Sequence, residues 1–121
     1  MNAVMVRRAL ICGASRGIGR AVAETLAASG IRIVALAREP RRLEALIQAL
    51  PGSGHLPLAV DLNHADATRQ AIAAALAEGP IHILLNNSSG PPPGPILGAT
   101  ESALLATFEQ QLLAAHRLTQ Q

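Results

Sequence analysis

A glycine-rich segment near the start of the chain has the residue types and the spacing of a phosphate-binding turn. Gly13, Gly17 and Gly19 lie between an apolar run and an amphipathic segment, and Ser15 and Arg16 lie between the glycines. Residues without a side chain permit a tight turn, a close approach of the backbone to a pyrophosphate, and a helix that begins close to a sheet. Free N–H groups and the dipole at the start of that helix attract an anion. The segment therefore predicts a dinucleotide site rather than an ordinary turn.

The residues after the second apolar run indicate which dinucleotide the site prefers. An NAD site usually has a carboxylate at this position, which accepts hydrogen bonds from the ribose hydroxyls. Here the position is Ala37, followed by Arg38. An arginine can form a two-pronged charged hydrogen bond with a 2′-phosphate, and Ser15 and Arg16 can reach the same phosphate. The pattern predicts NADP(H) as the cofactor.

The charges around Arg38 leave alternatives open. Arg38 itself could be a solvated loop charge, and Glu39 is acidic and adjacent, so it opposes a phosphate. Arg41 and Arg42 are interpreted as the exposed face of the next helix, although either could add to the positive field.

Four rounds of strand and helix are expected to position these residues. The predicted strands are 9–12, 31–37, 56–60 and 81–85, and the predicted helices are 18–29, 40–50 and 66–78. A proline-rich loop at 88–95 precedes a last helix, which Thr100 caps and in which Leu105, Phe108 and Leu112 share a face. Strands that are apolar throughout are typical of a parallel sheet covered on both faces. With right-handed crossovers, residues 1–121 are predicted to form one α/β domain, a Rossmann-like sheet with strand order 3-2-1-4.

The glycine spacing G-x-x-x-G-x-G, within the segment 13–27, resembles the short-chain dehydrogenase/reductase family and in particular its 3-oxoacyl-(acyl-carrier-protein) reductase branch. The resemblance continues through Asp61-Leu62 and Asn86-Asn87, after the third and fourth strands, and covers nearly the whole chain. It implies that Asp61 and Leu62 hold the adenine and that Asn87 lies beside the adenine ribose. As alternatives, Asp61 could cap the approach to a helix, and Asn86 is better explained as a structural hydrogen-bonding residue. The candidate cofactor-binding residues are Gly13, Ala14, Ser15, Arg16, Gly17, Ile18, Gly19, Arg38, Asp61, Leu62 and Asn87.

The sequence departs from the family pattern at several positions. Cys12 stands where the family usually has threonine, and the motif N-N-A-G is replaced by Asn-Asn-Ser-Ser at 86–89. In the last helix, Gln111 takes the place of an asparagine that supports a proton relay in the family. Glutamine keeps the amide but is longer by one methylene, which puts that relay in doubt.

The resemblance also implies catalytic groups that these residues do not include. Family members use a tyrosine as general acid/base, a lysine one helical turn further on, and a serine from a later strand. The 121 residues contain no tyrosine, and all ten basic residues other than histidine are arginine. We therefore expect the NADP(H)-binding front half of an oxidoreductase that reduces a carbonyl or oxidises an alcohol, incomplete relative to the full family fold and inactive alone. The alternatives are a non-catalytic dinucleotide-binding or interaction module, and a chain too altered to fold stably.

Composition argues against several other classes of function. The arginines are scattered with no Trp or Tyr between them, which argues against nucleic-acid binding. His55, His64 and His82 have no metal-ligand spacing with the single cysteine, Cys12, which also cannot form an internal disulfide. No run approaches the roughly 20 apolar residues of a membrane span, and no secretory signal is recognised, so a cytoplasmic protein is expected. The expected partners are a small carbonyl or alcohol substrate and a second copy of the chain, bound through the last helix.

Overall fold

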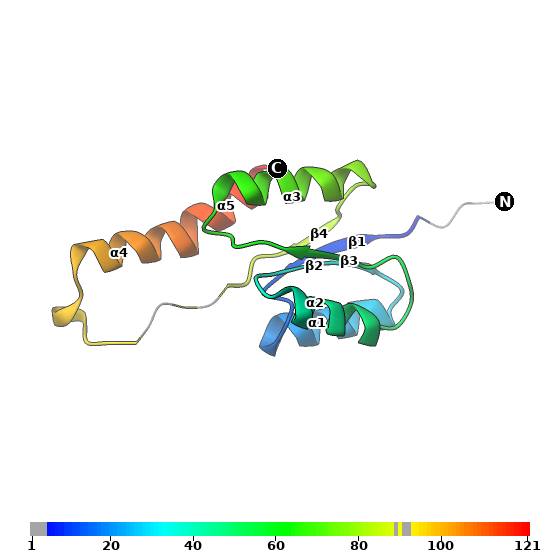
Figure 1. Ribbon diagram of the computed structural model, residues 1–121, viewed down its shortest axis with the longest axis horizontal. Coiled ribbons are helices and arrows are strands. Elements are labelled where there is room, and N and C mark those ends of the chain that lie inside the picture. Colours follow the sequence, from blue (N-terminus) through cyan, green and yellow to red (C-terminus); the bar gives the residue numbers. More distant parts are fainter. Residues whose placement is uncertain (1–4, 89, 91–92) are drawn as a thin grey trace.

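A parallel sheet forms the centre of the molecule. Within the residues that the structure describes, which are 5–88, 90 and 93–121, four strands pair in the order β3-β2-β1-β4. The computed structural model (Figure 1) has these strands at Arg8–Cys12 (β1), Arg32–Ala37 (β2), Leu56–Ala59 (β3) and Ile83–Leu85 (β4). The predicted fold class and strand order are confirmed. Ser89, Pro91 and Pro92 of the predicted loop lie outside the described residues.

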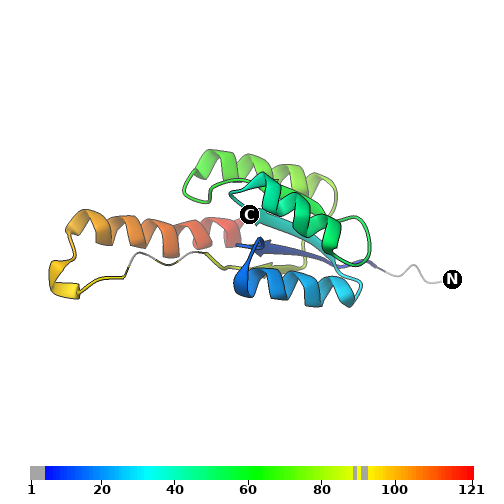
Figure 2. The same ribbon diagram turned by 60° about the horizontal axis from the view of Figure 1, so that its bottom comes forward.

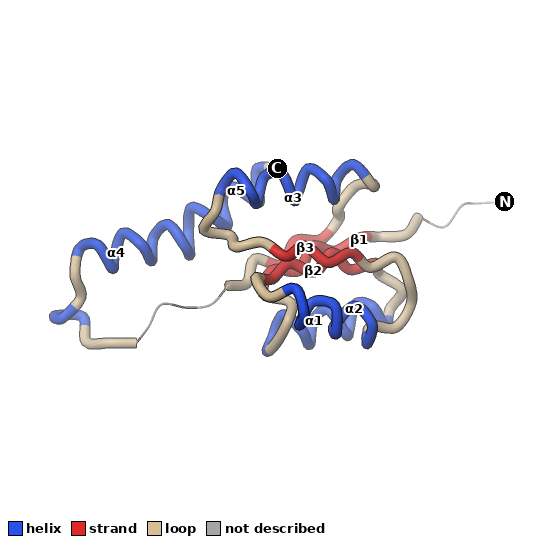
Figure 3. Tube along the Cα trace, in the orientation of Figure 1, coloured by secondary structure: helices blue, strands red, loops and turns tan. Residues whose placement is uncertain are grey.

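Helices cover both faces of the sheet (Figure 3). Helices α1 (Gly17–Ala28) and α2 (Pro40–Ala49) lie on one face, and α3 (Ala65–Ala77) and α5 (Ala114–Gln120) lie on the other. Strand β1 explains why the chain needs both layers. Ala9 and Ile11 pack toward α1 and α2, whereas Leu10 and Cys12 pack toward α3 and α5. Every residue of this strand is buried, as expected for a central parallel strand.

Helix α1 packs against the sheet through small residues rather than through its larger apolar ones. Its buried residues are Gly19, Ala23 and Ala27, while Val22 and Leu26 are half-buried at the side of the contact. Small side chains bring the helix axis close to the sheet, which places the helix start next to the end of β1. Ile18 is 73% exposed and is therefore not part of the core.

Side chains also fix the opposite, amino-terminal edge of the sheet. The buried Arg8 guanidinium donates from Nη1 to the carbonyl oxygens of Ala75 (2.9 Å) and Gly79 (2.6 Å), at the C-terminal end of α3. A cation at a helix C-terminus is favourable because the last carbonyls are unpaired and carry partial negative charge. His82 Nδ1 accepts the backbone N–H of Arg8 at 3.0 Å, and His55 Nδ1 accepts that of Ile33 at 3.0 Å.

The C-terminal part of the chain runs out from the sheet and returns to it. After a 3₁₀ turn at Ile96–Gly98, α4 (Glu101–Phe108) begins at Thr100, whose Oγ1 accepts the N–H of Ala103 at 3.1 Å. This confirms the predicted cap. The helix then passes through a π-helical segment (Glu109–Leu113) into α5, and α4 extends well away from the sheet (Figure 2). No helix among the described residues is long and apolar enough to cross a membrane.

Candidate functional site

The main pocket lies where the carboxyl ends of the strands meet. It has a volume of about 290 Å³ and combines residues from the glycine turn, the ends of β2 and β3, the segment after β4, and the π-helical segment. Strands β1 and β4 are neighbours in the sheet. The helices that follow them, α1 and α5, lie on opposite faces of the sheet. Such a position in an open α/β sheet is where ligands bind. The pocket is lined by Gly13, Ser15, Arg16, Gly17, Ile18, Leu36, Ala37, Arg38, Glu39, Arg42, Val60, Asp61, Leu62, Asn63, Asn87, Ser88 and Gln110.

Each of the three glycines in the turn has its own structural reason. Gly13 has φ +61°, and a Cβ there would lie 2.7 Å from Asn87 Nδ2. A Cβ on Gly19 would lie 2.1 Å from the carbonyl oxygen of Gly13, so only glycine lets α1 start against the turn. Gly17 has φ +62° and would meet nothing within 4 Å, so its backbone faces open space. The turn therefore leaves a concave, side-chain-free surface at the start of a helix, as an anion site requires.

Two of the predicted cofactor-binding residues shape the turn without lining the pocket. Ala14 is fully buried, and its N–H donates to the carbonyl oxygen of Leu36 at 3.2 Å. Gly19 lies behind the turn, against Gly13. The other nine predicted residues all line the pocket. Arg16 is the N-cap residue of α1, and because a guanidinium has no acceptor it leaves the first N–H groups of the helix without a side-chain cap.

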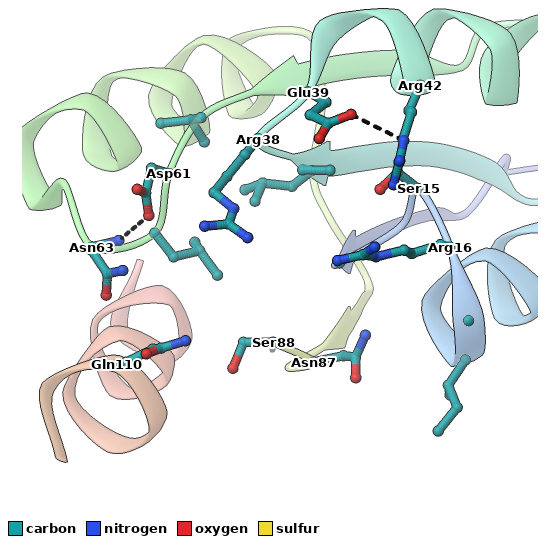
Figure 4. Close-up of a pocket in the computed structure, with 17 residues that line it drawn as sticks. Ser15, Arg16, Arg38, Glu39, Arg42, Asp61, Asn63, Asn87, Ser88 and Gln110 are labelled. Atoms are coloured by element: carbon teal, nitrogen blue, oxygen red, sulfur yellow. Dashed lines mark hydrogen bonds and ion pairs between the residues drawn. The ribbon is translucent and has the colours of Figure 1, made fainter. Parts of the chain in front are cut away.

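Three arginines give one side of the pocket its positive charge. Figure 4 shows Arg16, Arg38 and Arg42 converging from the turn, the end of β2 and the first turn of α2. Among the described residues, Arg16 and Arg38 have no ion-pair partner, whereas Arg42 Nε lies 3.0 Å from Glu39 Oε2.

Arg42 had been interpreted as an exposed helical residue, and it is exposed, but it also lines the pocket. Side chains of a helix tilt toward its N-terminus, so a charge in the first turn of α2 reaches the strand end that precedes it. That tilt is the signal by which sequence reasoning could have included Arg42.

Asp61 shapes the approach to a helix and also lines the pocket. Its Oδ1 accepts the N–H of Asn63 at 2.9 Å, and its backbone oxygen accepts the N–H of His64 at 2.9 Å and the Thr68 hydroxyl at 3.2 Å. The residue thus shapes the approach to α3. Together with Leu62 and Asn63, it also forms the wall of the pocket opposite the glycine turn (Figure 4).

The two asparagines after β4 have different partners. Asn87 Nδ2 donates to the carbonyl oxygen of Cys12 at 3.3 Å, which ties the end of β4 to the start of the glycine turn. Asn86 Nδ2 donates to Thr119 Oγ1 at 3.3 Å and does not line the main pocket. This agrees with the structural interpretation of Asn86, while Asn87 has a structural bond and a pocket position together.

Gln111 lies beside the main pocket rather than in it. It belongs to the π-helical segment and lines an adjoining cavity of about 210 Å³, where its Oε1 accepts the Ser88 hydroxyl at 3.4 Å. Gln110 and Ser88 line both cavities. Sequence reasoning did not single out Gln110, Ser88 or Asn63. Gln110 reaches the pocket only because the last helical region docks there, whereas Asn63 and Ser88 lie in the segments that follow β3 and β4.

Cys12 lies under the turn and cannot act as a ready nucleophile. The side chain is fully buried, and this burial raises the pKa of the thiol to about 11, although a backbone hydrogen bond involving Asn87 works in the opposite direction. A thiol rather than a thiolate is present at neutral pH, so Cys12 is a packing residue. No group of three or more metal-ligating side chains occurs in the described part of the chain.

Comparison with known proteins gives consistent matches. The family described as short chain dehydrogenase matches residues 7–121. D-erythrulose reductase of Gallus gallus is 40% identical over 114 residues, which cover 94% of this chain and 44% of that protein. L-xylulose reductase of Homo sapiens is 36% identical over 114 residues, covering 94% of this chain and 45% of that protein. The crystal structure of L-sorbose reductase from Gluconobacter frateurii, complexed with NADPH and L-sorbose, is similar with a TM-score of 0.89 at 30% identity, covering 97% of this chain and 46% of that one. The chain thus spans somewhat less than half the length of these relatives.

Proposed function

The chain belongs to the short-chain dehydrogenase family, and on that premise we propose that it forms the NADP(H)-binding part of an oxidoreductase that interconverts a carbonyl and an alcohol. The observation that carries this proposal is the pocket itself, in which a side-chain-free helix start faces a cluster of arginines. When bound, NADP(H) supplies the hydride, and the protein supplies binding, orientation and electrostatics.

The residues present fit such a dinucleotide. The turn at Gly13 and Gly17 offers backbone to a pyrophosphate, and a Cβ at Gly13 or Gly19 would fill the space that the turn needs. Arg38, with Ser15 and Arg16, suits a 2′-phosphate because a guanidinium matches the geometry of a phosphate. On the opposite wall, Asp61 and Leu62 suit an adenine, and Asn87 suits the adjoining ribose. Ala14 and Gly19 act through the shape of the turn, and Ile18 adds an apolar side chain to the pocket lining.

The names of the relatives suggest where to look for a substrate. D-erythrulose, L-xylulose and L-sorbose are all ketoses, and each names one of the similar reductases. We therefore propose a small polyhydroxylated ketone as the first substrate class to test with the parent enzyme. Ser88 and Gln111 are among the polar side chains that line the cavity next to the dinucleotide pocket, and we propose that the carbonyl lies there.

A second candidate function is a dinucleotide-binding module without catalysis. Gln111 favours it, because the longer side chain already accepts a hydrogen bond from Ser88 and moves the amide from the asparagine position of the family. Both candidates share the cofactor site and differ only in turnover.

The direct test is equilibrium titration of the 121-residue chain with NADPH and with NADH. Because the sequence has no Trp and no Tyr, NADPH emission can be followed without overlapping protein fluorescence. We expect saturable binding that is tighter for NADPH by about tenfold or more, the scale of one charge-assisted hydrogen bond. Binding of neither nucleotide would refute the cofactor site, and tighter NADH binding would refute the role of Arg38.

A further inference from the structure

The ion pair between Glu39 and Arg42 lies in the wall of the cofactor pocket and has no evident structural purpose. It joins the N-cap residue of α2 to the first turn of the same helix, with Nε and Oε2 3.0 Å apart. The side chains are 50% exposed for Arg42 and 65% exposed for Glu39, and exposed pairs of this kind contribute little to stability. Helix α2 is held instead by the buried Leu43 and Leu46. We therefore expect a role of this ion pair in the pocket, which both side chains line.

We propose that Arg42 determines the choice of cofactor by neutralising Glu39, a carboxylate that on its own would favour NAD(H). This inference rests on the proposed function, because it concerns the same pocket. Glu39 follows the end of β2 by two positions and lines the pocket. In NAD sites the carboxylate that accepts hydrogen bonds from the ribose hydroxyls usually stands at the position of Ala37. Glu39 lies two residues beyond that position but in the same pocket, where its charge repels the 2′-phosphate of NADP.

The charges of the pocket show why neutralisation matters. Arg16, Arg38 and Arg42 line it together with two carboxylates, those of Glu39 and Asp61. Without Arg42 the basic and acidic groups would be equal in number, and one of the acids would lie next to Arg38. The Glu39 carboxylate would then be free to compete with a phosphate for Arg38. In Figure 4 the dashed contact holds the Glu39 carboxylate on Arg42, and the Arg38 guanidinium points into the open centre of the pocket.

This inference predicts a specific pattern in a double-mutant cycle. Arg42→Ala should weaken NADPH binding by about tenfold or more, while NADH binding stays the same or tightens because Glu39 is released. Glu39→Gln alone should change NADPH binding little, since its charge is already paired. Adding Glu39→Gln to Arg42→Ala should restore most of the lost NADPH affinity. Arg41→Ala is the matched control, because Arg41 is exposed on the same helical turn and does not line the pocket.

Binding constants for both nucleotides, measured by fluorescence and by calorimetry, decide the matter, and thermal melting verifies that each variant is folded. Rescue by Glu39→Gln in the Arg42→Ala background supports neutralisation. Failure of that rescue would overturn it and leave Arg42 as a direct phosphate ligand. Equal weakening of NADPH and NADH, or unchanged binding in Arg42→Ala, would overturn it as well. If the unaltered chain binds neither nucleotide, the proposed function fails first, and this result is distinct from all the others.

Discussion

Cys12 is the residue whose chemistry is most clearly set by its surroundings. It ends the central strand, is fully buried, and has a thiol pKa raised to about 11 from 9.0 by desolvation. In the unfolded chain the thiol loses its proton at lower pH than in the folded chain. The contribution of Cys12 to the free energy of unfolding is therefore constant below about pH 9 and falls as the pH rises toward 11, by about 1.4 kcal/mol per pH unit.

The composition makes this prediction unusually clean. The sequence has no Tyr and no Lys, and it has one cysteine, so no other side chain is expected to titrate between histidine and arginine. Urea unfolding at a series of pH values should show the decline in the unaltered chain and a flat profile in Cys12→Ala over the same range. Equal slopes in the two proteins would mean that the thiol is not desolvated.

Gly19 predicts a second residue-level effect. An alanine there would place its Cβ 2.1 Å from the Gly13 carbonyl oxygen, so the turn has to move. We expect Gly19→Ala to weaken NADPH binding by at least about tenfold, which corresponds to the loss of one good phosphate contact. Gly94→Ala is the control, since nothing lies within 4 Å of that Cβ and Gly94 is not in the pocket. Titration with NADPH compares the two, and equal affinities would show that the turn tolerates the displacement.

At the scale of elements, Arg8 links β1 to α3 from inside the protein. Its two hydrogen bonds to the last carbonyls of α3 are backed by a contact of 3.6 Å to Glu78. Arg8→Met keeps an apolar stem but leaves these carbonyls unpaired, which should lower the free energy of unfolding by about 1–3 kcal/mol. The adjacent Arg7 is exposed, so Arg7→Met should have little effect. Urea unfolding tests both, and an equal loss in the two variants would contradict the anchoring role.

The exposed apolar face that runs along α4 into the π-helical segment carries a prediction about association. Leu105, Phe108 and Leu112 were predicted to share a face, and they are 63%, 50% and 54% exposed. We propose that this face contacts a second copy of the chain, because adjacent exposed apolar residues on a projecting helix mark interaction sites. Phe108→Asp should shift the chain toward monomer in analytical ultracentrifugation. Ala103→Asp, which adds the same charge elsewhere on α4, should not, and a monomeric unaltered chain would refute the proposal.

The bounds of helices and strands with a regular hydrophobic pattern were predicted closely. The bounds of elements that depend on contacts with distant parts of the chain were not. Strand β2 was expected from 31–37 and begins at Arg32, and α2 begins at Pro40 as expected. Strand β4 was expected from 81–85 but begins at Ile83, because His82 turns its ring toward the Arg8 N–H at the sheet edge. The π-helical segment was not foreseen. It places Gln110 at the pocket and is spanned by an ion pair between Glu109 and Arg117, which only the folded helix brings together.

The candidate site shows the same division. The glycine turn was predictable because steric demands on a backbone turn appear directly as residues without side chains. Arg38 was predictable because it follows a strand. Arg42 was predictable only as one of two arginines that could add to the positive field. Ser88 was not, since its contribution depends on the direction in which the segment after β4 leaves the sheet.

For the whole molecule, binding and turnover are expected to separate. The 121 residues hold a pocket suited to NADP(H) but contain no tyrosine and no lysine, the proton-transferring pair that the family resemblance implies. We expect the purified chain to bind NADPH and to leave it unoxidised in the presence of erythrulose, xylulose or sorbose. Absorbance of the reduced nicotinamide measures this over hours. Steady oxidation that depends on the sugar would show that other groups of this chain can deliver the proton.

The bond between Asn87 and Cys12 joins positions 75 residues apart, at the start of the glycine turn. Contacts between distant parts of a chain form slowly, so we expect β4 to pair with β1 late in folding. Before that pairing, the glycine turn and the arginines lack the part of the pocket wall that follows β4. In a refolding experiment, NADPH emission should rise later than the helical circular dichroism, so the nucleotide acts as a reporter for the last long-range step of folding.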